Sequence, residues 1–580
     1  MSSLRPYQEE CQKALLADLS NGSRSALYVL PTGTGKTQIA LATMADWPDQ
    51  QCGVLGIAHR EELVWQPWER WKQMYGEYPE MEMAEYRRKR GGSRLTFASK
   101  DSLHPSRLKE AFPDPKSIGL LWVDEAHHCV RANQSYSHIL DYFLGANPDC
   151  RLFGSTATPD RADEAALGES FDTVSFDFPL FDPDGGPSAI GDGWLVPIDQ
   201  QYVEVSDLHF DNVGSRGGDF IDSQLERMLL EDKGLYKITS ETKTISAGKL
   251  TLCFVPGIDS AITQCNILNA EISGWAYTIA SRVPAEHLEN EHVVNSGDKD
   301  RRRSLLKRWA RGEFQFLSNV GVLTEGFDEP LIGCISMGRP TKSRALYSQC
   351  VGRGTRVLPG VIEGPDWRIE SREERLNAIA NSGKSCILVL DFVGNSRHPL
   401  ISSLDILGGR YSDEVVEKAK ANVKKSGSAI SSQQALSEAA AQVEEEKRQQ
   451  LRKSVRAKTR STIVKIDPFS ILELSPAVRE PGWHKGRKPT PKQLDTLRKF
   501  KIPEKELSGI SFWQATKLLD KLIQRAKDGK CTYKQATLLA KYGQPTDVGF
   551  SQASKIIDAI ASNGWRPIPV TASTDRAAPF

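Results

Sequence analysis

The sequence lacks any apolar run close to the roughly 20 residues that a helix needs to span a bilayer. Its first ten residues, MSSLRPYQEE, also lack the apolar core of a secretory signal. We therefore expect a cytoplasmic protein with no membrane partner. The hydrophobic fraction of 39% and the charged fraction of 26% are ordinary for a soluble globular chain.

The 10 cysteines are scattered, and no two of them stand in a CxxC pair. Structural zinc sites and disulfide frameworks need clustered or regularly spaced cysteines. Neither is expected here, and the thiols are predicted to be reduced and mostly buried.

A strong excess of either charge is missing too, because the formal net charge is only +1. The average conceals an uneven distribution. From Arg479 to the end there are 19 Lys and Arg against 9 Asp and Glu. This pattern indicates a basic module attached to a larger, mildly acidic body, and basic modules often bind nucleic acid.

Short apolar runs alternate with amphipathic stretches over the first 400 residues, and each run ends in a polar or glycine-rich turn. This alternation is typical of a parallel sheet covered by helices on both faces. A first series comprises ALYVLP, VLGIAH, LTFAS, LLWVDEAH and RLFGSTATP. A second comprises LTLCFVP, EHVVNSG, FQFLSNVGVL, CISMGRP and SCILVLDF.

Two such series predict two α/β domains in tandem, joined near residues 185–200, where turn residues gather. We predict domains at 1–190 and 191–408. A helical connector, polar nearly all round, is predicted at 409–478, and it is expected to be solvated and not part of a core. A basic all-α domain is predicted at 479–580.

The last of these segments contains an internal repeat. TPKQLDTLRKF at 490–500 matches TYKQATLLAKY at 532–542, and FWQATKLLDKL at 512–522 matches FSQASKIIDAI at 550–560. Each copy is predicted to be a pair of short helices. Two interpretations of this tail stay open. It is either a nucleic-acid anchor, with Trp483 and Trp513 available for stacking, or a docking module for a protein partner.

A glycine-rich turn, Pro31–Thr37, follows the first apolar run. Glycines let the backbone wrap phosphates at a helix N-terminus. Lys36 would neutralise phosphate charge, and the Thr37 hydroxyl would bind Mg²⁺. The general phosphate-loop pattern has a glycine where Leu30 stands, so this segment departs from it.

Two adjacent carboxylates, Asp124 and Glu125, end the apolar run LLWVDEAH. Beside a phosphate loop, Asp124 fits a magnesium ligand, and Glu125 fits the base that orients the attacking water. Without the loop, they would simply be polar residues at the end of a strand.

Seven segments in one order carry a family resemblance over about residues 1–400. The segments are LRPYQ at 4–8, PTGTGKT, VDEAH, STAT at 155–158, LTEGFDEP at 323–330, QCVGRGTR at 349–356 and the connector GWLVPI. Together they resemble superfamily 2 DEAH-box helicases of the ResIII, XPB and RadD-like branch. The resemblance implies two RecA-like domains that hydrolyse ATP, with Mg²⁺, between them. The cysteine cluster of some RadD-like proteins is absent here.

The resemblance also implies roles for individual residues. Arg5 and Gln8 would contact adenine, and Gly326 and Asp328 would complete the nucleotide site from the second domain. His127, Thr156 and Thr158 would couple hydrolysis to domain motion. Gln349, Arg353 and Arg356 would face the γ-phosphate. The complete set for nucleotide binding and catalysis is Arg5, Gln8, Thr32, Gly33, Thr34, Gly35, Lys36, Thr37, Asp124, Glu125, Gly326, Asp328, Gln349, Arg353 and Arg356.

A nucleic-acid track is implied by weaker similarities. AHREEL and FASKDSL resemble helicase motifs Ia and Ib, which makes Arg60, Ser99 and Lys100 candidates for contacts with the phosphate backbone. The family implies DNA as the more common track and 3′-to-5′ movement. An RNA helicase, a translocase that remodels branched DNA, an ATP-gated clamp and the motor subunit of a defence complex are the alternatives.

Overall fold

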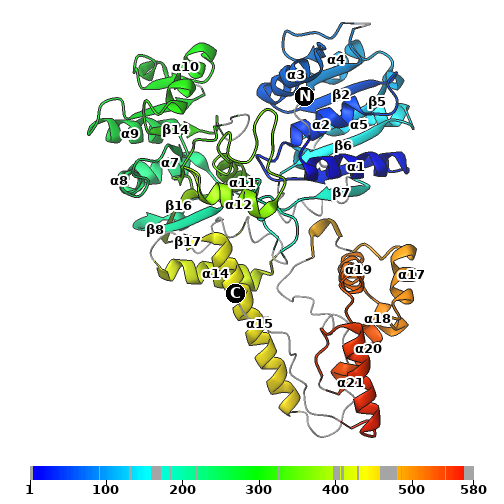
Figure 1. Ribbon diagram of the computed structural model, residues 1–580. Coiled ribbons are helices and arrows are strands. Elements are labelled where there is room, and N and C mark those ends of the chain that lie inside the picture. The colour runs from blue at the N-terminus through cyan, green and yellow to red at the C-terminus, as the bar shows by residue number, and fades with distance from the viewer. Residues whose placement is uncertain are drawn as a thin grey trace. The chain divides into compact units, whose positions relative to one another are not determined.

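The computed structural model describes residues 4–566, apart from 90–91, 130–133, 158–166, 168–170, 183–184, 217–218, 232, 282, 324–326, 328, 396–404, 406–410, 427–429, 458–479, 485 and 543. The chain divides into two compact units, Met1–Ala440 and Ala441–Phe580. The first unit contains two large sheets, shown in blue to cyan and in green in Figure 1.

The first sheet has seven strands in the order β3-β4-β2-β5-β6-β1-β7, and all its strand pairs are parallel. Strands β1, β4 and β5 are buried along nearly their whole length and are mostly apolar, because helices cover both faces of the sheet. The strands are β1 (Ser25–Val29), β2 (Gly53–Ala58), β3 (Glu80–Glu82), β4 (Leu95–Ser99), β5 (Ile118–Asp124), β6 (Arg151–Thr156) and β7 (Thr173–Asp177).

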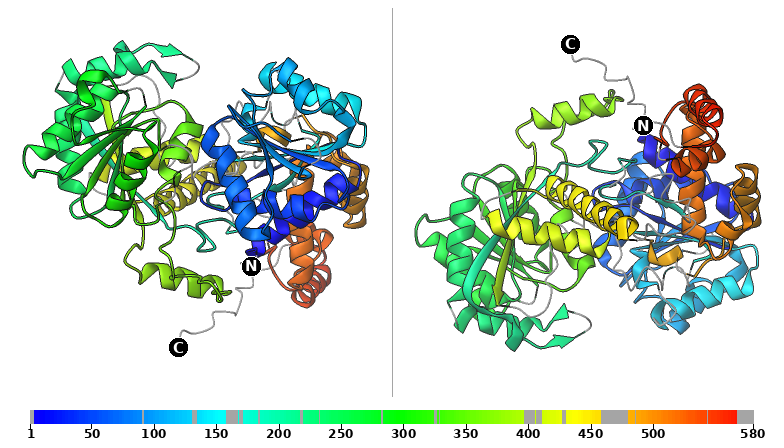
Figure 2. Two further views of the ribbon diagram at one scale, coloured as in Figure 1. Left: turned by 90° about the horizontal axis from the view of Figure 1, so that it is seen from above. Right: turned by 90° about the horizontal axis from the view of Figure 1, so that it is seen from below.

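The helices around this sheet fill the segments between its strands. They are α1 (Pro6–Ser20), α2 (Lys36–Ala45), α3 (Glu61–Tyr75), α4 (Pro105–Ala111) and α5 (Gln134–Ala146), with the short turns η1 (Pro115–Ser117) and η2 (Ala126–His128). Figure 2 shows helices on both sides of the strands. Parallel strands place all their carboxyl ends at one edge, and this arrangement gathers the candidate residues there.

The second sheet has eight strands in the order β13-β12-β14-β11-β15-β16-β8-β17. Only β17 runs antiparallel to its neighbour, β8. The strands are β8 (Ile198–His209), β11 (Thr251–Phe254), β12 (Ala276–Ala280), β13 (Val293–Asn295), β14 (Phe316–Val320), β15 (Cys334–Met337), β16 (Ile387–Asn395) and β17 (Ile430–Ser431). A separate small hairpin pairs β9 (Ser215–Arg216) with β10 (Asp219–Phe220).

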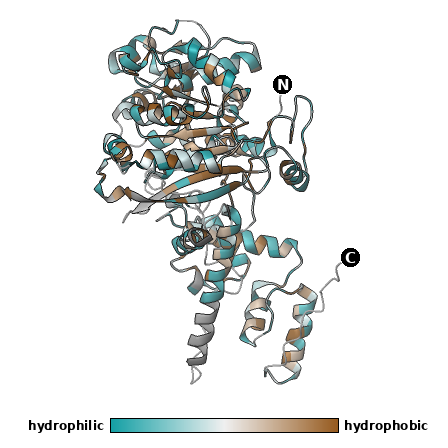
Figure 3. Cartoon of the chain, turned by 90° about the vertical axis from the view of Figure 1, so that its left-hand side faces the viewer, coloured by the Kyte–Doolittle hydropathy of each residue, from teal (hydrophilic) through white to brown (hydrophobic). Residues whose placement is uncertain are grey.

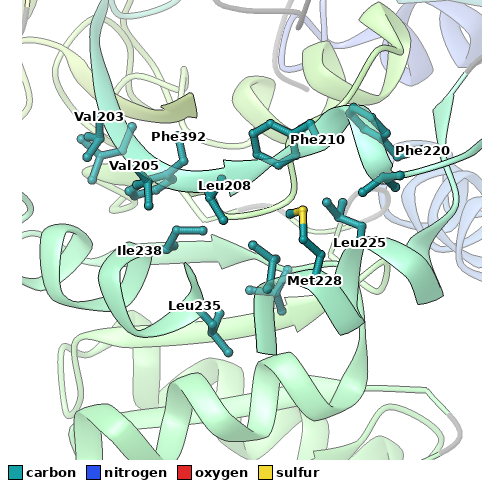
Figure 4. Packing of buried hydrophobic residues seen from close by; sticks show 14 of the residues in the cluster. Val203, Val205, Leu208, Phe210, Phe220, Leu225, Met228, Leu235, Ile238 and Phe392 are labelled. Carbon is teal, nitrogen blue, oxygen red and sulfur yellow. The ribbon is translucent and has the colours of Figure 1, made fainter. Parts of the chain in front are cut away.

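Helices also cover this second sheet. They are α7 (Asp222–Glu231), α8 (Gly234–Ile245), α9 (Ile258–Asn269), α10 (Lys299–Ala310), α11 (Arg344–Gly352) and α12 (Arg372–Ala380), with the turns η3 (Phe210–Asn212) and η4 (Ala285–His287). One core cluster joins β8, α7 and α8 through residues such as Val203, Leu225 and Leu235 (Figure 4). Strands in the interior are apolar and the outward helix faces are polar (Figure 3). Two tandem RecA-like sheets followed by a helical region confirm the predicted fold class.

The expectation of a polar, solvated connector after the second sheet is wrong for its first part. Helix α14 (Asp413–Ser426) buries Val415, Val416, Ala419 and Val423, each no more than 3% exposed. Strand β17 pairs with β8 at the edge of the sheet. These four small aliphatic residues stand among many charged residues, so the sequence pattern predicts a polar helix and does not reveal the buried face. Helix α15 (Ser432–Ala457) follows and continues into the second unit.

The second unit is an all-α repeat. Its helices are α17 (Pro491–Lys499), α18 (Glu504–Leu507), α19 (Phe512–Lys527), α20 (Tyr533–Lys541) and α21 (Phe550–Ser562), preceded by η6 (Gly482–His484). Thr490 and Thr532 begin the first helix of each copy with the same capping box. Gln493 then donates to Thr516 at 2.9 Å, and Gln535 donates to Ser554 at 3.1 Å. The matching contacts confirm the repeat.

No helix among the described residues has both the length and the apolar character needed to cross a membrane.

Candidate active site

The phosphate loop joins β1 to α2 and has the geometry that its glycines predict. Gly33 and Gly35 adopt φ values of +91° and +84°, which side chains other than glycine rarely tolerate. The Thr34 hydroxyl donates to the carbonyl of Pro31 at 2.7 Å and closes the turn. Helix α2 begins at Lys36, so its free N–H groups point toward the loop.

Two residues of the LRPYQ segment form hydrogen bonds to the backbone of this loop. The Tyr7 hydroxyl and the Gln8 Nε2 both donate to the carbonyl of Thr34, at 2.7 Å and 2.8 Å. The Gln8 Oε1 accepts from the backbone N–H of Arg5 at 2.9 Å. A Cβ at Gly35 would lie 2.4 Å from Gln8 Nε2, so only glycine fits there. Gln8 therefore links the segment before α1 to the phosphate loop.

The paired carboxylates lie at the end of β5, next to the loop. Asp124 accepts from the Ser155 hydroxyl at 2.8 Å and from the backbone N–H of Glu125 at 3.0 Å. The Lys36 Nζ lies 3.9 Å from Glu125 Oε1. Glu125 has a φ of +48°, a strained value for a side chain with a Cβ, and such strain gathers at functional sites.

The two carboxyl groups differ in how easily they ionise. Burial raises the pKa of Asp124 to about 6, and the negative charge of Glu125 adds to that rise. Burial also opposes ionisation of Glu125, but Lys36 and His127 outweigh it and hold the pKa of Glu125 well below its usual value. Glu125 therefore loses its proton at a lower pH than Asp124 and is ionised at neutral pH.

His127 connects the carboxylates to the end of β6. Its Nδ1 lies 3.1 Å from the Thr156 hydroxyl and 3.4 Å from Glu125 Oε2. The carbonyl of Thr156 in turn accepts from the backbone N–H of Leu30, just before the phosphate loop, at 3.0 Å. Thr156 therefore contacts both His127, beside the carboxylates, and Leu30, just before the phosphate loop. Thr158, the other residue expected to couple hydrolysis to motion, lies outside the described residues.

The second domain contributes the C-terminal end of α11. A Cβ at Gly352 would lie 2.7 Å from the Cβ of Thr32, so this end packs directly against the phosphate loop. Arg353 follows, is 8% exposed and donates from Nη1 to the carbonyl of Phe327 at 2.5 Å. Arg356 pairs with Leu195 in a short β-bridge and lies against Gly33.

A cleft of about 860 Å³ opens between these groups. Its lining includes most of the predicted residues, namely Arg5, Gln8, Thr32, Gly33, Gly35, Lys36, Thr37, Asp124, Glu125, Arg353 and Arg356. Gln349 is buried on α11 and does not belong to this lining. Gly326 and Asp328 lie outside the described residues. The cleft therefore joins a phosphate loop, an ionised carboxylate and two arginines from the facing domain.

Comparisons with known proteins agree with this geometry. Residues 1–161 match the family described as "Type III restriction enzyme, res subunit", or ResIII. The chain is 27% identical over 454 residues to the "Putative ATP-dependent helicase IRC3" of Saccharomyces cerevisiae, covering 75% of this chain and 58% of that protein. It is 29% identical to the "Putative mitochondrial ATP-dependent helicase irc3" of Schizosaccharomyces pombe, covering 71% and 61% respectively.

The chain thus resembles the ResIII family over its first 161 residues and two ATP-dependent helicases over a longer span. It spans about three fifths of the length of these two relatives, 58% and 61%. A third relative, the "Putative ATP-dependent DNA helicase fml2" of S. pombe, is 31% identical over 27% of this chain and 20% of its own length. Among solved structures, S. cerevisiae Dbp5 bound to RNA and ADP BeF3 aligns with 73% of this chain and 93% of its own at 15% identity and a TM-score of 0.43.

The nucleic-acid candidates follow two neighbouring strands. Ala58 of β2 pairs with Ser99 of β4, so Arg60 and Lys100 begin at the same edge of the sheet. Arg60 donates to the carbonyl of Gly321 at 3.5 Å, and Lys100 pairs with Asp101. Ser99 is only 6% exposed, which leaves its hydroxyl little access to a ligand.

Some residues of the site were not found from the sequence. Ser155 belongs to the STAT segment, yet no role was expected for it, although it binds Asp124. Glu363, Trp367 and Arg368 line the cleft from the segment between α11 and α12. The only sequence feature near these three residues is the turn sequence GPDW at 364–367, which does not by itself indicate a ligand-binding site.

Proposed function

We propose that this protein is an ATP-driven translocase or helicase that acts on DNA. One observation supports this most strongly. Lys36 and Glu125 of the first domain and Arg353 and Arg356 of the second line a single cleft. Hydrolysis can therefore depend on how the two domains meet, as a motor requires.

The chemistry follows from the positions of these groups. The phosphate-loop amides and Lys36 bind the β- and γ-phosphates of ATP. Glu125 is ionised and accepts a proton from a water, whose oxygen attacks the γ-phosphorus while ADP leaves. Arg353 and Arg356 stabilise the charge that develops on the transferred phosphoryl group, because a guanidinium fork meets two oxygens at once.

Magnesium fits the residues at the end of β5. Asp124 and the Thr37 hydroxyl both line the cleft beside the phosphate loop. No group of three or more His, Cys, Asp or Glu side chains that could hold a metal occurs in the described parts of the chain. Mg²⁺ suits such a sparse site, because it takes one or two protein oxygens and keeps water and substrate phosphates as its other ligands. When bound, it would neutralise charge on the phosphates.

DNA is the favoured track. A relative that matches part of this chain is named a DNA helicase. Arg60 and Lys100 at the edge of the first sheet would contact the phosphate backbone. The basic repeat would add a second, sequence-independent anchor. Its exposed lysines recur at equivalent positions, Lys492 with Lys534 and Lys499 with Lys541.

Steady-state ATPase measurements test this function. Turnover is measured for the full chain alone and then with single-stranded DNA, duplex DNA and RNA. Glu125→Gln is the inactive control, and Glu271→Gln, at an exposed position, is the matched change outside the cleft. We expect DNA to stimulate turnover strongly, and Glu125→Gln to reduce it by about a hundredfold or more.

Three outcomes would contradict parts of this proposal. Turnover that ignores every nucleic acid would contradict the motor. Stimulation by RNA alone would reassign the track to RNA. ATP-dependent retention of DNA with very slow turnover would favour a clamp.

A further inference from the structure

A short hairpin at Ile362–Ile369 lies between α11 and α12. The N–H of Ile369 donates to the carbonyl of Ile362 at 2.9 Å, and the N–H of Gly364 donates to the carbonyl of Trp367 at 2.8 Å. Between them, Glu363 and Arg368 face each other as an antiparallel bridge. Ile362 is 2% exposed and anchors the hairpin in the protein. The tip, Gly364–Trp367, is therefore a defined turn.

The hairpin is bound to the segment that precedes α1. Glu363 accepts from Arg5 through both of its oxygens, at 3.2 Å from Nε and 2.5 Å from Nη2. Arg368 donates to the carbonyl of Leu4 at 2.9 Å and to Glu363 at 3.3 Å. The second domain thus holds the LRPYQ segment, which in turn holds the phosphate loop through Gln8.

Trp367 stands at the tip of this hairpin, in the lining of the cleft. It is 49% exposed although it belongs to the same concave surface as Arg5 and Gln8. Its indole packs over Gly364, where a Cβ would lie 2.3 Å from Nε1. The glycine thus lets the ring lie against the turn. A large aromatic ring that stays half exposed in a cleft indicates a ligand-binding surface.

The contacts of the hairpin that carries Trp367 with Leu4 and Arg5 suggest which part of a ligand this ring meets. Lys36, Thr37 and the helix α2 N-terminus take the phosphates. Arg5, Glu363 and Arg368 are bound to one another, so they fix the part of the cleft beside the LRPYQ segment. When the phosphates of a nucleotide bind the loop, its base must bind elsewhere in the cleft. Aromatic rings commonly stack on nucleic-acid bases.

We propose that Trp367 forms the stacking surface for the base of the bound nucleotide, supplied by the second domain through the Ile362–Ile369 hairpin. This inference rests on the proposed ATP binding. It adds a residue that recognises the base while Lys36 and the arginines recognise the phosphates. Since the hairpin belongs to the second domain, base binding also depends on contact between the domains.

The test compares two ligands on the full chain, ATP and inorganic tripolyphosphate, which has the phosphates but no base. Affinities are measured by equilibrium binding for the wild type, Trp367→Ala and Trp367→Phe. Trp565→Ala is the matched control, because Trp565 is 53% exposed and lies in the C-terminal repeat. We expect Trp367→Ala to weaken ATP binding by roughly tenfold to a hundredfold and tripolyphosphate binding by less than about twofold.

The remaining variants complete the test. Trp367→Phe should restore most of the ATP affinity, and Trp565→Ala should behave as the wild type. In turnover, Trp367→Ala should raise the KM for ATP while kcat changes little, because the catalytic groups stay in place. Equal losses for both ligands, or no loss for ATP, would overturn the role of Trp367 while the ATPase proposal stands. If the wild type binds ATP no more tightly than tripolyphosphate, the role of Trp367 would also be overturned while the ATPase proposal stands. A wild type that binds neither ligand would overturn both proposals.

Discussion

The hydroxyl of Ser155 donates to Oδ1 of Asp124 at 2.8 Å, between the ends of two neighbouring strands. Trp122 donates to the same hydroxyl at 3.1 Å and fixes it from the other side. Ser155→Ala removes the hydrogen bond that orients the proposed magnesium ligand. We expect kcat for ATP to fall about tenfold and half-maximal activity to need more Mg²⁺, because partners of metal ligands typically contribute tenfold to a hundredfold.

Ser336→Ala is the control for this change. Ser336 is equally buried on β15 of the second sheet and bonds to the hydroxyl of Thr242 at 2.8 Å, away from the cleft. This variant should keep the wild-type Mg²⁺ dependence. A Mg²⁺ titration of ATPase activity decides the matter, and identical curves for Ser155→Ala and the wild type would contradict the role of Ser155.

Arg353 is predicted to act mainly in the transition state. Arg353→Lys keeps the charge but loses the planar fork, so DNA-stimulated kcat should fall by about a thousandfold, the lower range for arginine fingers. ATP affinity should change only a few-fold. Arg308→Lys, at a surface position 40% exposed, is the control. Single-turnover hydrolysis and equilibrium binding separate these effects, and an equal loss of both would argue for a structural role.

Arg5 and Glu363 are predicted to act as one unit in nucleotide binding. Their side chains are 19% and 31% exposed, so the pair should contribute about 1 kcal/mol, or about fivefold in affinity. Arg5→Ala, Glu363→Ala and the double variant should then weaken ATP binding equally. If Arg5 instead contacts adenine directly, as the family resemblance implies, Arg5→Ala will be clearly worse than Glu363→Ala.

Asp391 should make the second domain sensitive to pH. It lies buried on β16, where the Tyr347 hydroxyl and Gln200 Nε2 donate to it. Burial raises its pKa to about 7 from the ordinary value of 3.8. A carboxyl with a higher pKa in the folded state binds more protons there than in the unfolded state. Its contribution to stability is therefore fully present below about pH 4 and is lost as pH rises toward 7.

Asp391→Asn removes this dependence, since an amide cannot ionise and its oxygen still accepts from Tyr347. Thermal unfolding midpoints from pH 5 to 8 should fall less steeply in the variant than in the wild type. Asp141→Asn, exposed on α5, should leave the wild-type slope unchanged. Parallel slopes for Asp391→Asn and the wild type would contradict the prediction.

The basic repeat is predicted to bind the DNA backbone. Replacing Lys492, Lys499, Lys534 and Lys541 by Gln in the full chain should weaken binding to single-stranded DNA. The slope of log affinity against log salt should decrease by about 0.7 for each phosphate that a lysine no longer neutralises. Turnover at saturating DNA should stay unchanged, because these lysines belong to the second unit and do not line the cleft. An unchanged salt slope would favour the alternative, a docking module for a protein.

Much of the fold could be predicted because buried parallel strands have continuous apolar sequences. All ten runs identified in the sequence form strands, among them LTFAS as β4 and CISM within CISMGRP as β15. Of the strands in the two large sheets, β3, β7, β8, β12 and β17 are not among these runs; β3, Glu80–Glu82, is only three residues long and mostly acidic. The valines of α14 were missed because charged residues surround them in the sequence.

The sequence by itself determined the local chemistry of the site. Phosphate loops and strand-end carboxylates depend on neighbouring residues, so Gly33, Gly35, Lys36 and Asp124 could be recognised from short motifs. Only the tertiary structure decided which distant segments meet them. Arg5 and Glu363 are 358 residues apart, and nothing in the sequence of either segment predicts their contact. Their contact exists because two sheets pack into one unit, and packing of this kind is set by the whole chain.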